Sequence, residues 1–442
     1  MISIRSEGSE GSEGRRRRRS VVAVVAVAAM SLAACSSGGG KGESVTQGGI
    51  NGTDDGTSLT LWTRAPLELQ ANLLVKAYNA SHKNQVKLTI VPNDDYVTKV
   101  GAAAGGGGLP DLFASDIVYA PNWVKAGLWQ DLTSQIGKLP FAGAINKGHL
   151  AAGTYQGKEY VLPFVLDLSV MMWNKTLYKE AGLDPDKGPT TLADFVTQAK
   201  AIAALKKPGV YGTYFGGNCG GCGVFTWFPM IWASGNDVLS PDGTQSLLDS
   251  DTAKQVYAAW KDLWNSGAVD PASKDETGAT WVGPFQQNKI GIMPYPASLL
   301  PTVGKTVDAG VAPIPGPDGG ESTFVGGDGI GVSKDSRHEA EAWNFLAWLM
   351  SDDAQVNVLA ANDSIVSRSD LANNKYAVKD PRVVAINQVA GSPNSKTPIA
   401  IDFQQAFNAA GSPWVTLFRD QVFNGKDNLS QDNSAINGVL GQ

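Results

Sequence analysis

Apolar and polar residues alternate with a period of two in two segments of the first quarter of the chain. "SLTLWTRAP" at Ser58–Pro66 and "QVKLTIVP" at Gln85–Pro92 both show this alternation, which is typical of β-strands. Between them, Ala71, Leu74 and Tyr78 fall on one face of a helix. The three segments predict a β-α-β unit whose strands pair in parallel through a right-handed crossover.

Three later segments have the apolar stripe of an amphipathic helix: Thr191–Leu205, Asp251–Ser266 and Glu339–Met350. The first opens with Thr191 and Asp194, three residues apart, which is a helix-capping pattern. Short apolar runs between the helices, such as "GIMPY" and "GIGVS", predict further strands. The alternation of strands and helices indicates an α/β fold with helices on both faces of a sheet.

The beginning of the chain has the pattern of an export signal. Arg15–Arg19 are followed by an apolar run, Val21–Met30, that is too short to cross a membrane. The run ends in "LAAC", which resembles a bacterial lipobox with Cys35 as the acylated residue. The alternative is an ordinary secretory signal with an incidental cysteine, and export by Sec or Tat stays open. We expect residues 1–34 to be a signal peptide and residues 35–57, rich in glycine and serine, to be a tether.

Size and charge narrow the class of protein. The chain has 442 residues and a formal net charge of −6, and residues 1–34 carry six arginines and three glutamates. The exported part is therefore acidic, which argues against nucleic acid as a partner and against a basic membrane-binding face. We expect two lobes, a monomer, and contact with the membrane only through the lipid at Cys35.

The other two cysteines, Cys219 and Cys222, stand in the glycine-rich stretch "NCGGC". In an exported protein such a pair is most simply a disulfide. Free thiols and a redox or metal role stay open, although a zinc site needs two more ligands and no histidine is near in sequence. We expect no metal and no cofactor.

Several blocks of sequence resemble the extracellular solute-binding proteins of ABC importers, the family that includes maltose-binding protein. "YVLPFVLDLSVMMWNKTLYKEAGLDP" at Tyr160–Pro185 is similar to that family's hinge block. Four further blocks follow the family's order, namely "GGGGLPDLFASD", "AGLWQDLT", "PTTLADFVTQAKAI" and "VGGDGIGVSKDSRHEAEAWNFLAWLMSDDAQ". The resemblance covers essentially all of Leu59–Gln442.

The resemblance implies a two-lobed periplasmic-binding-protein fold of type II, a Venus flytrap whose lobes are joined by crossing hinge strands. It places the crossings near Pro163–Leu168, near Met293–Val311 and near Ser351. The expected first lobe is 58–164 with 303–350, and the expected second lobe is 165–302 with 351–442. It also implies a hinge closure on the ligand and docking onto a membrane permease that is driven by a cytoplasmic ATPase.

The resemblance is to the carbohydrate-binding branch of the family. A sugar site needs aromatic rings for stacking and polar groups for the hydroxyls. We expect ligand contacts from tryptophans outside the helical stripes and from polar residues at strand ends, the hinge and the family's blocks: Trp62, Trp227, Trp281, Trp414, Asp95, Asp116, Asp167, Asp328 and Arg368. For Asp116 the alternative is a cap of the helix that follows, at Pro121–Ala126.

Two other functions stay open at this point. A lipid-anchored glycoside-active enzyme would also pair carboxylates with aromatic rings. The chain has neither a G-x-S-x-G elbow nor an H-E-x-x-H motif, and few histidines, so other hydrolytic chemistry is disfavoured. The same fold with a polyamine or another small solute as its cargo is the second alternative. The main expectation is a non-enzymatic lipoprotein that captures a mono- or oligosaccharide outside the cytoplasm and delivers it to an ABC permease.

Overall fold

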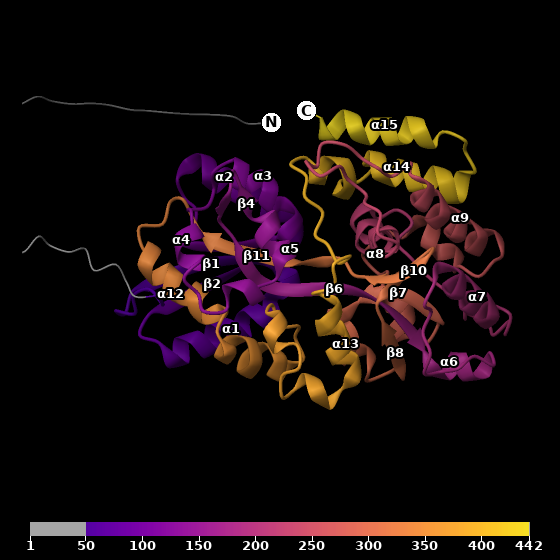
Figure 1. The fold of residues 1–442 in the computed structure, drawn as a ribbon, viewed down its shortest axis with the longest axis horizontal. Helices are drawn as coiled ribbons and strands as arrows, with labels where there is room; N and C mark the ends of the chain where they lie inside the picture. The colour runs from indigo at the N-terminus through magenta and orange to yellow at the C-terminus, as the bar shows by residue number, and fades with distance from the viewer. Residues whose placement is uncertain (1–49, 442) are drawn as a thin grey trace, which may run out of the picture. The chain divides into compact units, whose positions relative to one another are not determined.

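The computed structural model describes residues 50–441 (Figure 1). The described part begins with the expected β-α-β unit. β1 (Ser58–Arg64) and β2 (Gln85–Val91) pair in parallel, and α1 (Glu68–Ser81) connects them. Ala71, Leu74 and Tyr78 of α1 are all buried, as the helical spacing predicts.

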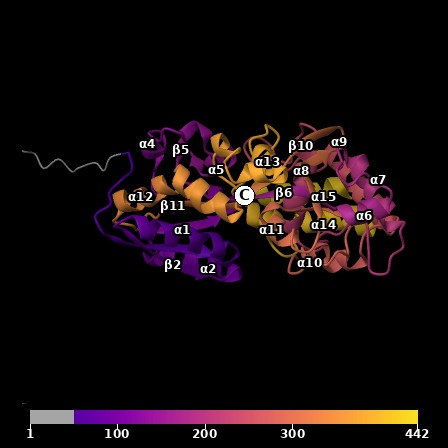
Figure 2. The same cartoon turned by 90° about the horizontal axis from the view of Figure 1, so that it is seen from below.

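The main sheet has the strand order β2-β1-β3-β11-β6-β7, with β8 also on β6. β3 (Leu112–Asp116) is parallel to β1, and β11 (Val325–Val332) runs antiparallel between β3 and β6. The 13-residue β6 (Leu162–Asn174) pairs with β11 over its first half and with β7 (Ile292–Pro296) and β8 (Ala309–Ala312) over its second half. β6 therefore crosses from one lobe to the other (Figures 1 and 2).

Helices surround each half of this sheet (Figure 2). Beside α1, the first lobe carries α2 (Asn93–Gly106), α3 (Ala120–Lys125), α4 (Thr133–Ile136), α5 (Lys147–Ala152) and α12 (Glu339–Leu349). The second carries α6 (Lys175–Glu180), α7 (Leu192–Ala203), α8 (Gly220–Trp232), α9 (Asp251–Asn265), α10 (Gly283–Gln286), α11 (Leu300–Val303), α13 (Pro381–Val389), α14 (Pro413–Arg419) and α15 (Leu429–Leu440). Two small hairpins complete the strands, β4 (Thr154–Tyr155) with β5 (Lys158–Glu159) and β9 (Ile314–Gly316) with β10 (Gly319–Ser322).

The three helices predicted from apolar stripes are α7, α9 and α12. α7 begins with the expected capping box. The backbone N–H of Asp194 donates to Thr191 Oγ1 at 3.0 Å, and the N–H of Thr191 donates to Asp194 Oδ2 at 3.0 Å. Both groups otherwise lack a partner at a helix start, so the pair fixes where α7 begins.

Strand pairing suggests lobe boundaries that differ from the expected ones. β8 pairs with the second half of β6, and β9 lies against α8, so residues 309–322 belong with the second lobe. η6 (Asp353–Leu359) packs on α1 and α12, because Ala354 and Leu359 enter the apolar cluster of those helices. We therefore propose that the chain returns to the first lobe in β11 and leaves it after η6, not at residues 303 and 351.

The last residues of the expected tether are bound to the first lobe. The indole N–H of Trp343 donates to the carbonyl of Ile50 at 2.9 Å, and the N–H of Thr53 donates to the carbonyl of Ala340 at 3.0 Å. Gly52 is so close to α12 that a Cβ there would lie 2.3 Å from the oxygen of Ala340. Because these contacts hold the backbone in place, we propose that the tether ends before Ile50 and that residues 50–57 belong with the first lobe.

The signal peptide at 1–34 and the acylated Cys35 lie outside the described residues. Between residues 50 and 441, no helix combines the length and the apolar character that a membrane crossing requires.

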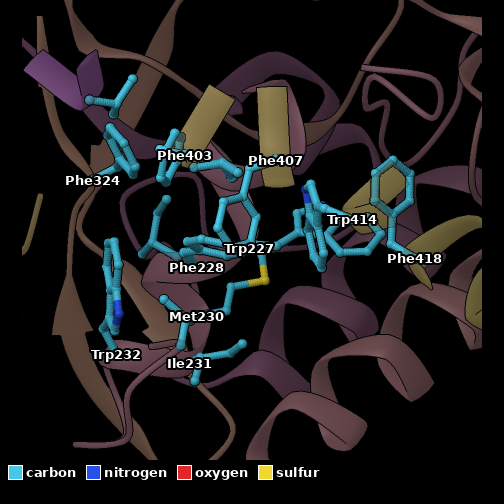
Figure 3. Close-up of a cluster of buried hydrophobic side chains, with 14 of the residues drawn as sticks. Trp227, Phe228, Met230, Ile231, Trp232, Phe324, Phe403, Phe407, Trp414 and Phe418 are labelled. Atoms are coloured by element: carbon cyan, nitrogen blue, oxygen red, sulfur yellow. The ribbon is translucent and has the colours of Figure 1, made fainter. Parts of the chain in front are cut away.

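An aromatic cluster forms the core of the second lobe (Figure 3). Trp227 of α8 stacks on Trp260 of α9, with ring centroids 5.0 Å apart and planes 12° apart. The ring of Trp414 on α14 meets Trp227 edge-on at 6.2 Å, and Phe418 packs against both. Helices α8, α9 and α14 are thus joined by ring contacts deep in the lobe.

Candidate functional site

A cavity of about 770 Å³ lies where β6 passes between the lobes. Its first-lobe side includes polar side chains from the end of β1, from the helices that follow and from β3, namely Arg64, Gln70, Asn93 and Asp116. Its other side includes the rings of Phe225, Trp281, Phe324 and Phe403. The cavity is large enough for a small organic ligand and combines a charged wall with an aromatic wall.

Arg64 is the centre of the charged wall. It pairs with Asp328 of β11, with Nε 2.8 Å and Nη2 2.5 Å from Asp328 Oδ1. Its Nη2 also lies 3.2 Å from Asp116 Oδ2 at the end of β3, and its Nη1 donates to Asn93 Oδ1 at 3.2 Å. Three strands that are far apart in sequence thus meet at one guanidinium.

The opposite charges in this cluster stabilise the charged form of Arg64. Burial disfavours the charged form of Arg64, but Asp328 and Asp116 outweigh that effect and raise the pKa of Arg64 above its ordinary value. Burial raises the pKa of Asp328 to about 6, although the charge of Arg64 opposes this. The contact of 2.5 Å between Arg64 Nη2 and Asp328 Oδ1 fixes the guanidinium at the cavity wall.

Asp116 lines the cavity and caps a short helical turn, but it does not cap the helix at Pro121–Ala126 considered from the sequence, because Tyr119 is the N-cap of α3. The N–H of Val118 donates to Asp116 Oδ1 at 3.4 Å, which caps the short η2 (Ile117–Tyr119). The same side chain lines the cavity and is 24% exposed. Because one oxygen serves the cap and the other faces Arg64, the carboxylate is held in a defined orientation.

Asp167 lies in β6 opposite Gly326 of β11 and lines the cavity. The N–H of Ser298 donates to Asp167 Oδ1 at 3.3 Å. Burial raises the pKa of Asp167 to about 6, although the bond from Ser298 and the charge of Arg64 lower it. A partly desolvated carboxylate at this position is suited to accept a hydrogen bond from a bound ligand.

Trp281 is the tryptophan that lines the cavity. It follows a loop after Glu276, and its ring lies 6.2 Å from that of Tyr295 on β7. Phe225 on α8 and Phe324 before β11 are 5.4 Å apart on the same wall. The aromatic wall is thus built from a loop, a helix and a strand entry.

The structure places two of the predicted tryptophans elsewhere. Trp227 is 1% exposed and Trp414 is 0% exposed, and both belong to the aromatic core of Figure 3. The indole N–H of Trp414 donates to the carbonyl of Gly220 at 3.1 Å. A ring enclosed by other rings cannot stack on a ligand, so ligand contacts for Trp227 and Trp414 are not supported.

Trp62, Asp95 and Arg368 also lie outside the cavity lining. The ring of Trp62 is covered by Lys99, whose Nζ is 4.6 Å from the ring centroid. Asp95 is exposed in the first turn of α2. Arg368 is buried over the ring of Phe141 and forms ion pairs with Asp352 at 2.6 Å and with Asp370 at 2.5 Å. It lines a different cavity, of about 470 Å³.

Asp328 is close to the cavity but does not line it. It is 0% exposed, and Arg64 stands between it and the cavity. The sequence singled out Asp328 but missed Arg64, whose position directly after the alternation of β1 placed it at a strand end. No local pattern marked the other cavity residues, namely Gln70, Asn93, Phe225, Phe324 and Phe403. Apolar stripes and helix starts are common in the chain, so such a position alone does not predict contact with a ligand.

No group of three or more metal-ligating side chains occurs within the stretch that the structure covers, residues 50–441. The polar side chains that line the cavity, besides the two cysteines, are one arginine, two carboxylates, three amides and two hydroxyls. Such a set provides hydrogen-bond donors and acceptors on one wall and flat apolar surfaces on the other. It is suited to reversible binding of a polar ligand that has an apolar face.

Residues 65–356 match the model of the family described as "Bacterial extracellular solute-binding protein". The chain belongs to this family. The diacetylchitobiose binding protein DasA of Streptomyces coelicolor is 26% identical to this solute-binding protein over 367 residues, which are 78% of this chain and 80% of the relative.

Solved structures show the same fold at lower identity. The cyclic alpha-maltosyl-1,6-maltose binding protein from Arthrobacter globiformis has a TM-score of 0.74 at 23% identity, covering 88% of this chain and 100% of the other. The sugar-binding protein MalE from Xanthomonas citri has a TM-score of 0.74 at 16% identity, covering 87% and 97%. The two-lobed periplasmic-binding fold expected from the sequence is confirmed.

Family membership places this solute-binding protein outside the cytoplasm. The family and the structural relatives are binding proteins, so an enzyme of glycoside chemistry is not favoured.

Proposed function

We propose that this solute-binding protein captures a carbohydrate in the cavity between its lobes and delivers it to the permease of an ABC importer. The observation that carries the proposal is the pairing of the two walls. Trp281 and Phe225, which are half-buried, offer flat apolar surfaces, and Asp116 and Asp167 offer carboxylates. A sugar has both a face of C–H groups and a rim of hydroxyls, so it uses both walls.

The roles of the individual groups follow from their positions. Trp281 stacks on a sugar ring, and Asp167 accepts a hydroxyl hydrogen bond at the hinge. Asp116 and Arg64 bind hydroxyls from the first lobe, since each retains contact with the cavity beside its internal partners. A ligand that touches both walls stabilises the closed arrangement of the lobes, because it binds that state better than the open one.

The relatives agree with a saccharide as the cargo. DasA is named for diacetylchitobiose, and the Arthrobacter globiformis protein for a cyclic maltosyl-maltose. Another structure of the same fold was obtained with mannobiose bound. These names support the class of ligand, and they differ in the sugar.

A thermal-shift screen followed by calorimetry tests the proposal. The panel contains maltose, mannobiose and diacetylchitobiose, with spermidine and amino acids as controls for other cargo. A sugar at about 100 times its Kd raises the free energy of unfolding by about 2.7 kcal/mol. The bound sugar must be recovered unchanged, because a glycoside-active enzyme would convert it.

Two variants locate the binding. Trp281→Ala and Asp167→Asn should weaken the sugar that binds, whereas Asp262→Ala, on the surface of α9, should not. A shift with spermidine alone would keep the fold and overturn the carbohydrate assignment. Unchanged affinity in both cavity variants would place the site elsewhere.

Membrane attachment through Cys35 is a second part of the proposal. We expect residues 1–34 to be removed and Cys35 to carry the lipid, with residues 36–49 between the lipid and the bound segment at Ile50. A lipid anchor keeps the receptor at high local concentration beside its permease. Mass spectrometry of the N-terminal peptide from the membrane fraction should show acylated Cys35. The Cys35→Ser variant should appear in the medium, and a membrane-bound variant would contradict the anchor.

A further inference from the structure

The disulfide between Cys219 and Cys222 forms part of the cavity wall. Cys219 is the N-cap residue of α8, and its Sγ accepts a hydrogen bond from the N–H of Cys222 at 3.1 Å. Both cysteines and the intervening Gly221 line the cavity. The sulfur atoms therefore lie beside the space in which we place the ligand.

The sulfur atoms contact the loop that leads to Trp281. We call residues 276–281 the Trp281 loop. Gly278 in this loop has a φ of 102°. A Cβ on Gly278 would lie 2.8 Å from Cys219 Sγ and 3.1 Å from Cys222 Sγ. The backbone of the Trp281 loop thus rests directly on the disulfide, and a larger residue than glycine has no room there.

The same loop has a second support at Glu276. The carboxylate of Glu276 accepts hydrogen bonds from the N–H of Gly278 at 2.7 Å, from the N–H of Thr280 at 3.1 Å and from the hydroxyl of Tyr214 at 3.0 Å. The N–H of Asn218, next to Cys219, donates to the carbonyl of Glu276 at 2.9 Å. The disulfide and Glu276 support the loop from two sides, and Trp281 follows within three residues of Gly278.

The sequence separation of the cysteines suggests that the disulfide acts locally. A bond across only three positions closes a very short loop and constrains the unfolded chain less than a bond across a long one. Gly216 fits closely too, since a Cβ there would lie 2.9 Å from the Cβ atoms of both cysteines. Glycines around the bond allow the helix start and the Trp281 loop to approach each other.

We propose that the Cys219–Cys222 disulfide is a positioning element of the carbohydrate site, which holds the Trp281 loop and thereby fixes the ring of Trp281 against the ligand. This inference rests on the carbohydrate-binding function proposed above and deepens it. The disulfide fixes the shape of the aromatic wall, so it contributes to the choice of sugar.

A double-mutant cycle on sugar affinity tests the inference. The full chain, the Cys219→Ser/Cys222→Ser variant, Trp281→Ala and the combined variant are titrated with maltose, mannobiose and diacetylchitobiose by calorimetry. If the disulfide acts through Trp281, its loss weakens binding about tenfold in the full chain and less than about twofold when Trp281 is already alanine. If the combined variant loses affinity by the product of the two single losses, the disulfide and Trp281 act independently and the inference is overturned. Full affinity in the variant without the disulfide would overturn it too.

Two controls separate positioning from general destabilisation. Asn84→Ala removes hydrogen bonds to residues 53–57, none of which lines the cavity, and it should leave the sugar affinity within about twofold. If the double cysteine variant does not fold, dithiothreitol added to the full chain breaks the same bond, since its two thiols are oxidised as the two cysteines are reduced. The reduced chain should then show the same loss of affinity.

The outcomes also separate the inference from the proposed function. If the full chain binds none of the sugars, both are overturned. If the full chain binds a sugar but Trp281→Ala binds it equally well, carbohydrate binding stands and the positioning role falls.

Discussion

Arg64 at the end of β1 and Asp328 in β11 form an ion pair across 264 positions of sequence, with Arg64 Nε 2.8 Å from Asp328 Oδ1. Asp328 is fully buried, whereas the side chain of Arg64 keeps 16% of its surface exposed. Gly327 precedes Asp328 with a φ of 97°, and a Cβ there would lie 2.0 Å from the carbonyl oxygen of Val165. The glycine lets β11 pass close to β6 and brings the carboxylate under the guanidinium.

We expect Asp328→Ala to lower the free energy of unfolding by about 3 kcal/mol, because it leaves a largely buried arginine without its main partner. Denaturant unfolding measures the change. Asp262→Ala removes an ion pair on the surface, in which Lys200 Nζ lies 2.6 Å from Asp262 Oδ2 and both side chains are partly exposed. It should lower the free energy of unfolding by about 0.5 kcal/mol or less. Equal effects of the two substitutions would contradict a structural role for the buried pair.

Trp281 and Trp227 should respond in opposite ways to truncation. Trp281→Ala should weaken sugar binding about tenfold, equivalent to about 1.4 kcal/mol, with little change in stability. Trp227→Ala should lower the free energy of unfolding by about 4 kcal/mol, since it leaves a void beside Trp260 and Trp414. Calorimetry and denaturant unfolding of both variants measure the two effects. A stable Trp227→Ala protein that has lost only its sugar affinity would show that the core assignment is wrong.

Asn84 should be a stability determinant of the first lobe. Its Oδ1 accepts hydrogen bonds from the N–H groups of Asp55, Gly56 and Thr57 at 3.0 to 3.1 Å, and its Nδ2 donates to the carbonyl of Thr53 at 2.7 Å. Asn84 is 0% exposed. We expect Asn84→Ala to lower the free energy of unfolding by about 2 kcal/mol, because several backbone groups lose their partner.

The control for Asn84 is Asn357→Ala, since Asn357 is exposed and donates to Asp353 at 3.1 Å. It should cost less than about 0.5 kcal/mol. Proteolysis gives a second readout. Cleavage after Lys83 or within residues 50–57 should become faster in Asn84→Ala and stay unchanged in Asn357→Ala. Equal protection in both variants would mean that residues 50–57 are held without Asn84.

His149 should make the protein sensitive to acid. It is 0% exposed, its Nε2–H donates to the carbonyl of Gly326 at 3.0 Å, and burial lowers the pKa of His149 to about 4. The unfolded chain binds a proton near pH 6.5 while the folded chain does not, so stability falls as the pH falls from about 6.5 to 4. Over that window the loss amounts to about 3 kcal/mol.

The His149→Gln variant keeps a hydrogen-bond donor but does not titrate, and it isolates this effect. The free energy of unfolding is measured for the full chain and for His149→Gln at pH 7 and at pH 4. Between these pH values the full chain should lose more stability than the variant. Buried carboxylates such as Asp167 titrate in both proteins and cancel in the comparison. A difference that does not depend on pH would show that folding leaves the pKa of His149 unchanged.

The sequence by itself determined the local elements and the family. Periodicity and capping residues located α1, α7, α9 and α12, because the 3.6-residue repeat and the groups at a helix start are local properties. Two of the carboxylates that the sequence singled out line the cavity. Asp116 was expected there because the carboxyl ends of strands face the ligand side of such sheets, and Asp167 because the resemblance places a polar residue at the hinge.

Only the tertiary structure decided which tryptophans face the cavity and which fill the core. Trp227, Trp281 and Trp414 all have apolar neighbours in the sequence. Those neighbours do not indicate whether a ring packs in the core, as Trp227 does on Trp260, or lines the cavity, as Trp281 does. The same holds for Arg64, which meets Asp328 only after β1, β3 and β11 are side by side. Contacts between residues hundreds of positions apart depend on strand order and helix packing, and no local pattern of residues encodes those.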